Sequence, residues 1–182
     1  MKEKSTEFVG DQDGYQRLWT PHRLVYIQSG QQPADSDCPF CIGPTRSDAE
    51  SLIVRRGVHC FVVLNLYPYN SGHLLICPYR HVDTYDKATT DEITEMAVLT
   101  QQAMSVLKAV NGAHGFNIGM NQGQVAGAGI AAHLHQHVVP RWNNDANFFP
   151  IIAQTKALPK LLGEVQQEIS TAWSGLFDIE HH

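Results

Sequence analysis

The stretch AAHLHQHVVPRW, residues 131–142, places three histidines at every second position of an apolar run. A period of two is the side-chain period of a β-strand, so the spacing predicts a strand with His133, His135 and His137 on one face. The opposite face would carry Ala132, Leu134, Gln136 and Val138. Proline removes a hydrogen-bond donor from a sheet, and Pro140 is therefore expected to end the strand or to place it at an edge.

Three histidines in strict alternation have two chemical interpretations. Strand histidines at alternate positions can share a metal ion, as in tri-histidine zinc sites. Alternatively, a neutral imidazole serves as a nucleophile or as an acid–base group. The preceding loop, NQGQVAGAG (121–129), is rich in glycine, and the N–H groups of such loops can bind phosphate oxygens. It is not a P-loop, because no Gly-Lys-Ser/Thr follows. Phosphate beside imidazole favours catalysis through a phosphorus–nitrogen intermediate.

The composition limits the class of protein. The chain has 182 residues, of which 43% are hydrophobic and 17% charged, as in ordinary globular domains. The formal net charge is −5 without a basic stripe, which argues against a nucleic-acid partner but leaves an anionic small ligand open. No apolar run is long enough to span a membrane, and the polar start does not resemble a signal peptide. We therefore expect a cytoplasmic protein that binds neither nucleic acid nor membranes.

Short β-branched runs bounded by turn residues indicate an antiparallel sheet. Besides the histidine stretch, the expected strands are 51–57, 59–66, 73–78 and 115–121. Segment 89–112 has helical periodicity, a capping box of Thr89 and Glu92, and a terminal Gly112. A second helix is expected at 158–173. Strands and helices in separate blocks predict an α+β fold.

Several motifs, taken in their order, resemble the histidine-triad (HIT) superfamily of nucleotide hydrolases and transferases. They are CPFC (38–41), FVVLNLYPYNSGHLLICPYRH (61–81), GFNIGMNQG (115–123) and the triad with its following Pro-Arg. The resemblance implies a HIT-like fold, a five-stranded antiparallel sheet with one long helix and an extra C-terminal helix. It also implies a single domain over 1–182, with a core at about 38–142, an N-terminal arm and a C-terminal helical extension.

Two further stretches, RLWTPHRLVYI (17–27) and NFFPIIAQTKALPKLL (147–162), resemble the bacterial HIT-type diadenosine tetraphosphate phosphorylases. That narrower resemblance implies phosphorolysis of diadenosine tetraphosphate to ATP and ADP through a nucleotidyl-histidine, with inorganic phosphate as the acceptor. Hydrolysis of dinucleoside polyphosphates or nucleoside phosphoramidates is the alternative within the superfamily. From other classes, a non-catalytic adenine-nucleotide-binding module and a zinc-stabilised interaction protein remain open.

The resemblance also assigns roles to residues of this sequence. His135 would be the nucleophile, His137 would support the chemistry near the phosphate, and His133 would orient His135 or hold a backbone carbonyl. The implied nucleotide-binding residues are Asn65 at the ribose, Leu66 at the base, and Asn121, Gly127 and Gly129 at the phosphates. The sequence departs from the superfamily at Gln136, where an apolar residue is usual, and at Ala-Gly-Ala-Gly-Ile (126–130), which lacks a side chain for the leaving group. That departure indicates either backbone donors to the leaving group or a roomier pocket, and a roomier pocket could admit phosphate in place of water.

The CPFC motif has the spacing of a zinc knuckle, although two reduced thiols in a turn would look the same. By resemblance, a structural zinc site would consist of Cys38, Cys41, His81 and His133, and the chemistry itself would require no cofactor. Cys60 and Cys77 are expected to be small buried residues. The remaining histidines are expected on the surface, as satisfied core residues or in a tail: His22, His59, His73, His114, His181 and His182. HIT domains commonly pair, so a homodimer or a larger homo-oligomer is expected.

Overall fold

The computed structural model describes residues 38–143, 145 and 160–178 of the chain. Some of the expectations above concern segments outside this range. They are the N-terminal arm with the stretch 17–27, most of the stretch 147–162, and His22, His181 and His182.

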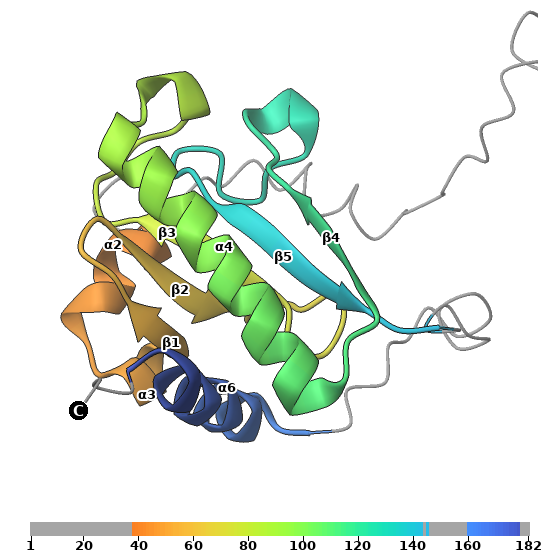
Figure 1. Cartoon of the computed structure of the whole chain (residues 1–182). Coiled ribbons are helices and arrows are strands. Elements are labelled where there is room, and N and C mark those ends of the chain that lie inside the picture. Colours follow the sequence, from red (N-terminus) through yellow and green to blue (C-terminus); the bar gives the residue numbers. More distant parts are fainter. Residues whose placement is uncertain (1–37, 144, 146–159, 179–182) are drawn as a thin grey trace, which may run out of the picture. The chain divides into compact units, whose positions relative to one another are not determined.

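Within the described residues, five strands form one antiparallel sheet in the order β1-β2-β3-β5-β4 (Figure 1). The strands are β1 (Ile53–Arg56), β2 (Cys60–Leu64), β3 (Leu74–Pro78), β4 (Gly115–Gly119) and β5 (Gln136–Arg141). The helices are α2 (Pro39–Ile42), α3 (Asp48–Ser51), α4 (Thr90–Asn111) and α6 (Leu162–Phe177), with 3-10 turns η2 (Gly43–Thr45), η3 (Tyr85–Lys87) and η4 (Gln124–Ala126). The predicted α+β fold, with its five-stranded sheet, long helix and C-terminal helix, is confirmed.

Helix α4 begins and ends where the sequence predicts. The Thr89 side chain accepts a hydrogen bond from the backbone of Glu92, whose carboxylate accepts one from the backbone of Thr89. Gly112 ends the helix in the left-handed conformation, with φ of 62°, which a residue without Cβ adopts at little cost. The helix therefore has a fixed length and presents one buried face to the sheet.

Helices α4 and α6 cover the same face of the sheet (Figure 1). Alternate residues of the central strands contribute to this main core, including Val62, Leu74 and Ile76. Helix α6 contributes the fully buried Trp173, whose indole N–H donates to Gln102 on α4 at 3.1 Å. The opposite face carries a second, smaller core, formed by Cys38, Phe40, Ile53, Phe61, Leu75 and Cys77. The histidines project toward this second core, which positions the site.

The predicted histidine strand is wrong in its first half, because β5 begins only at Gln136. The pairing of β3 with β5 starts at Ile76 and Gln136, so the preceding residues have no strand neighbour on that side. The amide of Leu134 instead donates to the carbonyl of Val82 in the loop after β3. His133 and His135 therefore lie in an extended segment ahead of the strand, and His137 lies within it.

The prediction that Pro140 ends the strand or places it at an edge of the sheet is wrong. Strand β5 continues to Arg141 and lies between β3 and β4. Pro140 pairs with Phe116 on β4, whereas the pairing with β3 stops at Val138. On the β3 side, the Pro140 carbonyl accepts a hydrogen bond from Asn70 at 3.0 Å. The proline is tolerated because one neighbour has already ended at its position.

None of the helices in the described ranges combines the length and the apolar character needed to cross a membrane.

Candidate active site

Residues from four strands line up across the second face of the sheet. His137 on β5 lies opposite Leu75 on β3, Leu75 lies opposite Val63 on β2, and Val63 lies opposite Ile53 on β1. Directly opposed residues of neighbouring strands point to the same face. This register therefore forms a row that begins at a histidine and continues over apolar side chains toward β1.

His135 is buried, with 6% of its surface exposed, and its hydrogen bonding identifies its tautomer. Its Nδ1 lies 2.8 Å from the carbonyl oxygen of His133. A carbonyl can only accept, so Nδ1 carries the proton and Nε2 carries the lone pair. Burial lowers the pKa of His135, although the bond to the carbonyl opposes this effect. The side chain is therefore a neutral imidazole with its nucleophilic nitrogen at Nε2.

His137 has the opposite tautomer, which follows from a chain of hydrogen bonds. The amide of Tyr69 donates to Nδ1 of His73 at 3.1 Å, so this nitrogen accepts. Neutral His73 then carries its proton on Nε2, which lies 2.9 Å from Nδ1 of His137 and donates to it. The proton of neutral His137 is therefore on Nε2. Two histidines 5.1 Å apart between ring centroids thus present a lone pair and an N–H respectively.

His73 belongs to this site. The sequence predicts it only on the surface or as a satisfied core residue and does not connect it with the triad. It is fully buried, and besides Tyr69 and His137 its Nδ1 lies 3.3 Å from Nδ2 of Asn65. No spacing in the sequence links position 73 to the triad. The pairing of Leu74 with Val138 brings the two segments together, and this register becomes visible only in the fold.

Phe40 is a second residue that the sequence did not single out. It sits on the short helix α2, between Cys38 and Cys41. Its ring centroid lies 5.4 Å from that of His133 and 5.1 Å from that of His135. Because the ring packs against both imidazoles, it restricts the orientation of the proposed nucleophile.

A cavity of about 410 Å³ opens beside Phe40, a size typical of small-ligand sites. Val63 and Leu75, from the row described above, line it. Asn65 and Leu66, predicted at the ribose and the base, also line it. The amide of Asn65 is already engaged, because its Oδ1 accepts from the backbone of Tyr67 at 3.0 Å and its Nδ2 faces His73.

The glycine-rich loop connects β4 to the triad. Asn121, Gly127 and Gly129 lie on this loop, and Ile130 from its end lines the cavity. Gly127 has φ of 80°, and its amide donates to the carbonyl of Gln124 at 2.9 Å. A phosphate contact from the Gly127 amide would therefore require this turn to open.

Gln136, the polar departure within the triad, faces away from the cavity. Its Nε2 donates to Oγ1 of Thr100 at 2.6 Å, and this hydroxyl donates to the carbonyl of Met96 at 2.7 Å. Both partners belong to α4. Gln136, which lies between His135 and His137, therefore attaches the start of β5 to the long helix.

The four predicted metal ligands lie together, and their donor atoms are all within 4.8 Å of one another. Sγ of Cys41 lies 3.2 Å from Nδ1 of His81, and Sγ of Cys38 lies 3.4 Å from Nδ1 of His133. Tetrahedral zinc, with bonds of about 2.3 Å to sulfur and 2.0–2.1 Å to nitrogen, would separate such pairs by roughly 3.6 Å.

The tautomer of His133 also suits a metal ligand. Its Nε2 lies 2.9 Å from the carbonyl oxygen of Pro78, so this nitrogen carries the proton and Nδ1 turns its lone pair toward the sulfurs. A ligating histidine that donates its other N–H to a carbonyl is the usual arrangement at zinc sites. The donor set therefore fits a closed four-ligand metal site.

Comparison with known proteins agrees with this geometry. A family model described as "HIT domain" matches residues 46–144. A protein named AP-4-A phosphorylase from Mycobacterium tuberculosis is 45% identical over 172 residues, covering 91% of this chain and 88% of that protein. A bis(5'-adenosyl)-triphosphatase from Dictyostelium discoideum is 30% identical over 115 residues, covering 60% of this chain and 75% of that protein.

A solved structure gives the same result. A zinc-bound histidine triad family protein from Mycobacterium smegmatis superimposes with a TM-score of 0.65 at 25% identity, covering 81% of this chain and all of that one. The matched domain model, the extended match to the mycobacterial relative and the shared fold lead to one conclusion. This chain belongs to the HIT domain family.

Proposed function

We propose that this protein is a nucleotidyltransferase that cleaves diadenosine tetraphosphate by phosphorolysis to ATP and ADP. One observation carries the proposal: His135 offers a lone pair at Nε2 while His137, beside it, offers an N–H at the same ring position. Nucleophilic displacement at phosphorus benefits from this combination, one group to attack and one to stabilise the leaving oxygen by a hydrogen bond. The extended match to a protein named AP-4-A phosphorylase supports the same substrate.

In the first step, Nε2 of His135 attacks the α-phosphorus of one adenosine. A phosphorus–nitrogen bond forms, and the bond from this phosphorus to the bridging oxygen breaks. His137 donates a hydrogen bond from Nε2 to the departing oxygen, which takes the electron pair of the broken bond and leaves as a terminal phosphate oxygen of ATP. Burial favours the reaction, since it keeps His135 neutral and its lone pair available.

In the second step, an oxygen of inorganic phosphate attacks the same phosphorus. The phosphorus–nitrogen bond breaks and its electron pair returns to Nε2 of His135, while the attacking phosphate oxygen, which carries no proton, becomes the new bridging oxygen. The product is ADP. The stretch Ala128–Gly129–Ile130 supports phosphate as the acceptor, because two of these residues bring little or no side chain to the place of attack.

The test is product analysis with isotopically labelled phosphate. The proposal expects the label to appear in ADP and the rate of product formation to depend on phosphate concentration. Release of unlabelled AMP at the same rate with and without phosphate would instead identify the hydrolase, the activity named for the Dictyostelium relative. The control is His135→Ala, which should still bind AMP but lose turnover by several orders of magnitude. Turnover by that variant would exclude the proposed nucleophile.

We also propose that Cys38, Cys41, His81 and His133 hold a structural zinc ion. Their mutual distances and the tautomer of His133 support this assignment. With four protein ligands no coordination position is left for substrate, so the ion would stabilise the site and take no part in the reaction. The chemistry then requires no cofactor.

Two alternatives from other classes make different predictions. A non-catalytic nucleotide-binding module would need neither a neutral His135 nor an N–H on His137, and it would bind diadenosine tetraphosphate without consuming it. A zinc-stabilised interaction protein would not need the cavity. A cytoplasmic location, a homo-oligomeric state and the division into a HIT core with terminal extensions stay predictions from the sequence.

A further inference from the structure

The cavity has two ends that differ in chemistry. One end lies beside the proposed nucleophile, because Phe40, whose ring packs against His135, lines the cavity. From there the row of opposed residues leads to Leu75 on β3 and Val63 on β2, both of which line the cavity. Adjacent strands are about 4.8 Å apart, so β2 lies roughly 10 Å from β5. The far end of the cavity, between β2 and the segment that contains η2 and α3, is therefore where a base would lie.

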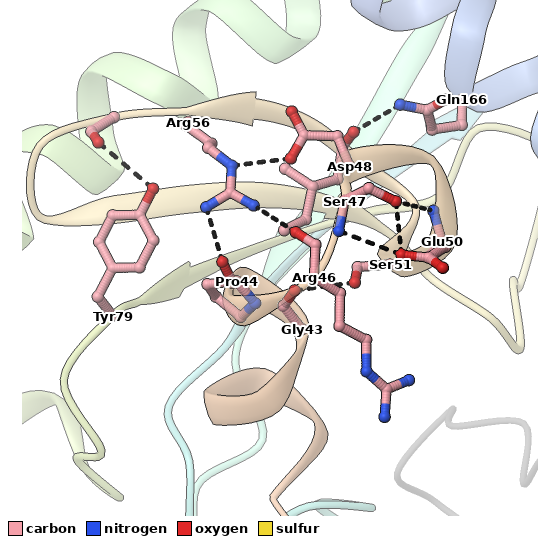
Figure 2. A network of polar contacts seen from close by, with 12 residues as sticks. Gly43, Pro44, Arg46, Ser47, Asp48, Glu50, Ser51, Arg56, Tyr79 and Gln166 are labelled. Carbon is pink, nitrogen blue, oxygen red and sulfur yellow. Dashed lines mark hydrogen bonds and ion pairs between the residues drawn. The ribbon is translucent and has the colours of Figure 1, made fainter.

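Two charged residues, Arg46 and Glu50, line the cavity at this far end. The carboxylate of Glu50 already accepts hydrogen bonds from the backbone and hydroxyl of Ser47, at 3.3 and 2.6 Å, in the capping box of α3. No described residue forms a hydrogen bond with the guanidinium of Arg46, which points away from the neighbouring network in Figure 2. Arg46 is therefore the cationic donor that the far end offers to a ligand.

The backbone that carries Arg46 is fixed, although its side chain is exposed. The guanidinium of Arg56 on β1 bonds to the Asp48 carboxylate at 2.7 Å, to the Pro44 carbonyl at 3.0 Å and to the Arg46 carbonyl at 3.2 Å (Figure 2). These three bonds span both sides of Arg46 and attach the segment to the sheet. The side chain thus extends from a rigid support, which reduces the entropy cost of binding a ligand.

A guanidinium is planar and carries donors only. It stacks on aromatic faces and pairs with acceptor edges, and a purine offers a large face with the N7 acceptor, to which guanine adds O6. We propose that Arg46 binds the purine base of the nucleotide whose α-phosphorus faces His135, and thereby favours purine over pyrimidine nucleotides. This inference rests on the proposed nucleotide-binding function.

The experiment is calorimetric titration of the full chain and its Arg46→Ala variant with AMP, GMP, CMP and ribose 5-phosphate. The last ligand has the phosphate and the sugar but no base. We expect the dissociation constants of AMP and GMP to rise about tenfold in the variant, the size expected for loss of a charged hydrogen-bonding partner. The affinity for ribose 5-phosphate should not change, and the preference for AMP over CMP should shrink.

Two matched variants sharpen the result. Arg46→Lys keeps the positive charge but not the planar fork, and we expect it to restore little of the affinity for AMP. Arg55→Ala removes a neighbouring arginine whose guanidinium bonds to Asp178 at 2.6 Å, and we expect it to bind all four ligands like the unmodified protein.

Unchanged binding of AMP by Arg46→Ala would overturn the inference. Equal losses for AMP and ribose 5-phosphate would also overturn it, because they would place Arg46 at the phosphate. If the unmodified protein bound none of the nucleotides, the proposed function itself would fail, and this inference with it.

Discussion

The chemistry of the site depends on which nitrogen of each imidazole carries the proton. Backbone groups settle this question, because an amide can only donate and a carbonyl can only accept. The His133 carbonyl orients His135, and the Tyr69 amide, acting through His73, orients His137. Two histidines that are only two residues apart therefore carry their protons on different ring nitrogens, because their backbone partners differ.

The first prediction concerns His73. Replacing it by phenylalanine keeps a ring but removes the donor to Nδ1 of His137, so the N–H of His137 is no longer held at Nε2. We expect kcat for diadenosine tetraphosphate to fall by about 100-fold, with little change in KM. For a p-nitrophenyl ester of AMP, whose leaving phenolate spreads its negative charge over the ring, kcat should fall much less.

The control for this prediction is His59→Phe, a change at an exposed histidine outside the site. This change should leave kcat for both substrates unaltered. If His73→Phe slowed the two substrates equally, His73 would have a structural role and the hydrogen-bond chain would not explain catalysis.

Part of this site was predictable from the sequence. Strict alternation made His133, His135 and His137 conspicuous, and the CPFC spacing pointed to Cys38 and Cys41. His73, Phe40 and Arg46 were not recognised, because their contacts depend on strand register and on the path of the chain after α2. Local patterns identify residues that act with sequence neighbours, whereas partners from distant segments require the fold.

Among the elements, the turn between β2 and β3 is held against the end of β5. The Arg141 guanidinium bonds to the Asp145 carboxylate, with Nη2 and Oδ1 2.8 Å apart, and Asn70 in the turn donates to the same carboxylate at 3.0 Å. This turn includes Tyr69, whose amide orients His73. The ion pair therefore supports, from outside the site, the hydrogen bonds to which we assign a role in catalysis.

The second prediction concerns Asp145. The bonds from Arg141 lower the pKa of this carboxyl to about 2, from an ordinary value of 3.8. The folded-state pKa is below the unfolded one, so the interaction stabilises the protein fully above about pH 4, and this stabilisation is lost as the pH falls toward 2. We expect urea denaturation to show Asp145→Asn less stable than the unmodified protein at pH 7, with the difference disappearing near pH 2.

A constant difference between these two proteins from pH 7 to pH 2 would contradict the assignment. It would mean that the charge on Asp145 does not contribute to stability through Arg141.

The elements differ in how well their limits follow from sequence. The ends of α4 were predicted within a residue, because its capping box and its terminal glycine are local signals. The start of β5 was not predicted correctly. The alternating pattern continues upstream of Gln136, where Leu134 bonds to Val82 in the loop after β3 and not to a strand. The second helix was expected at 158–173, whereas α6 spans Leu162–Phe177. Side-chain alternation thus indicates extended backbone but cannot tell whether a partner strand lies beside it.

In the whole molecule, the cysteine–histidine cluster joins three segments. Helix α2 and its N-cap residue provide the two cysteines, His81 follows β3, and His133 precedes β5. The backbone of His133 also holds His135. Occupation of this cluster should therefore affect both the stability of the fold and the position of the nucleophile.

The third prediction is the result of removing a ligand. Cys41→Ser should contain far less than one equivalent of zinc, measured by emission spectrometry after purification without chelator. Its melting temperature should fall by several degrees, because metal binding contributes to folding. Cys60→Ala, which removes a buried thiol outside the cluster, should keep the full zinc content. A protein purified in this way with no zinc would refute the site.

For the whole molecule, the family and the fold were predictable from the order of the motifs. The match to the HIT domain model agrees with this prediction of the family. The cavity was not predictable, because its lining joins residues of β2 and β3 with the segment around α2 and α3, which lies elsewhere in the sequence.

Trapping the covalent intermediate tests the central claim most directly. The protein is mixed with diadenosine tetraphosphate in the absence of phosphate, quenched in alkali, digested and analysed by mass spectrometry. We expect one adenylyl group on His135, absent from His135→Ala and released as ADP when phosphate is added before the quench. Turnover without any adduct at the shortest times, or an adduct on another residue, would contradict the mechanism.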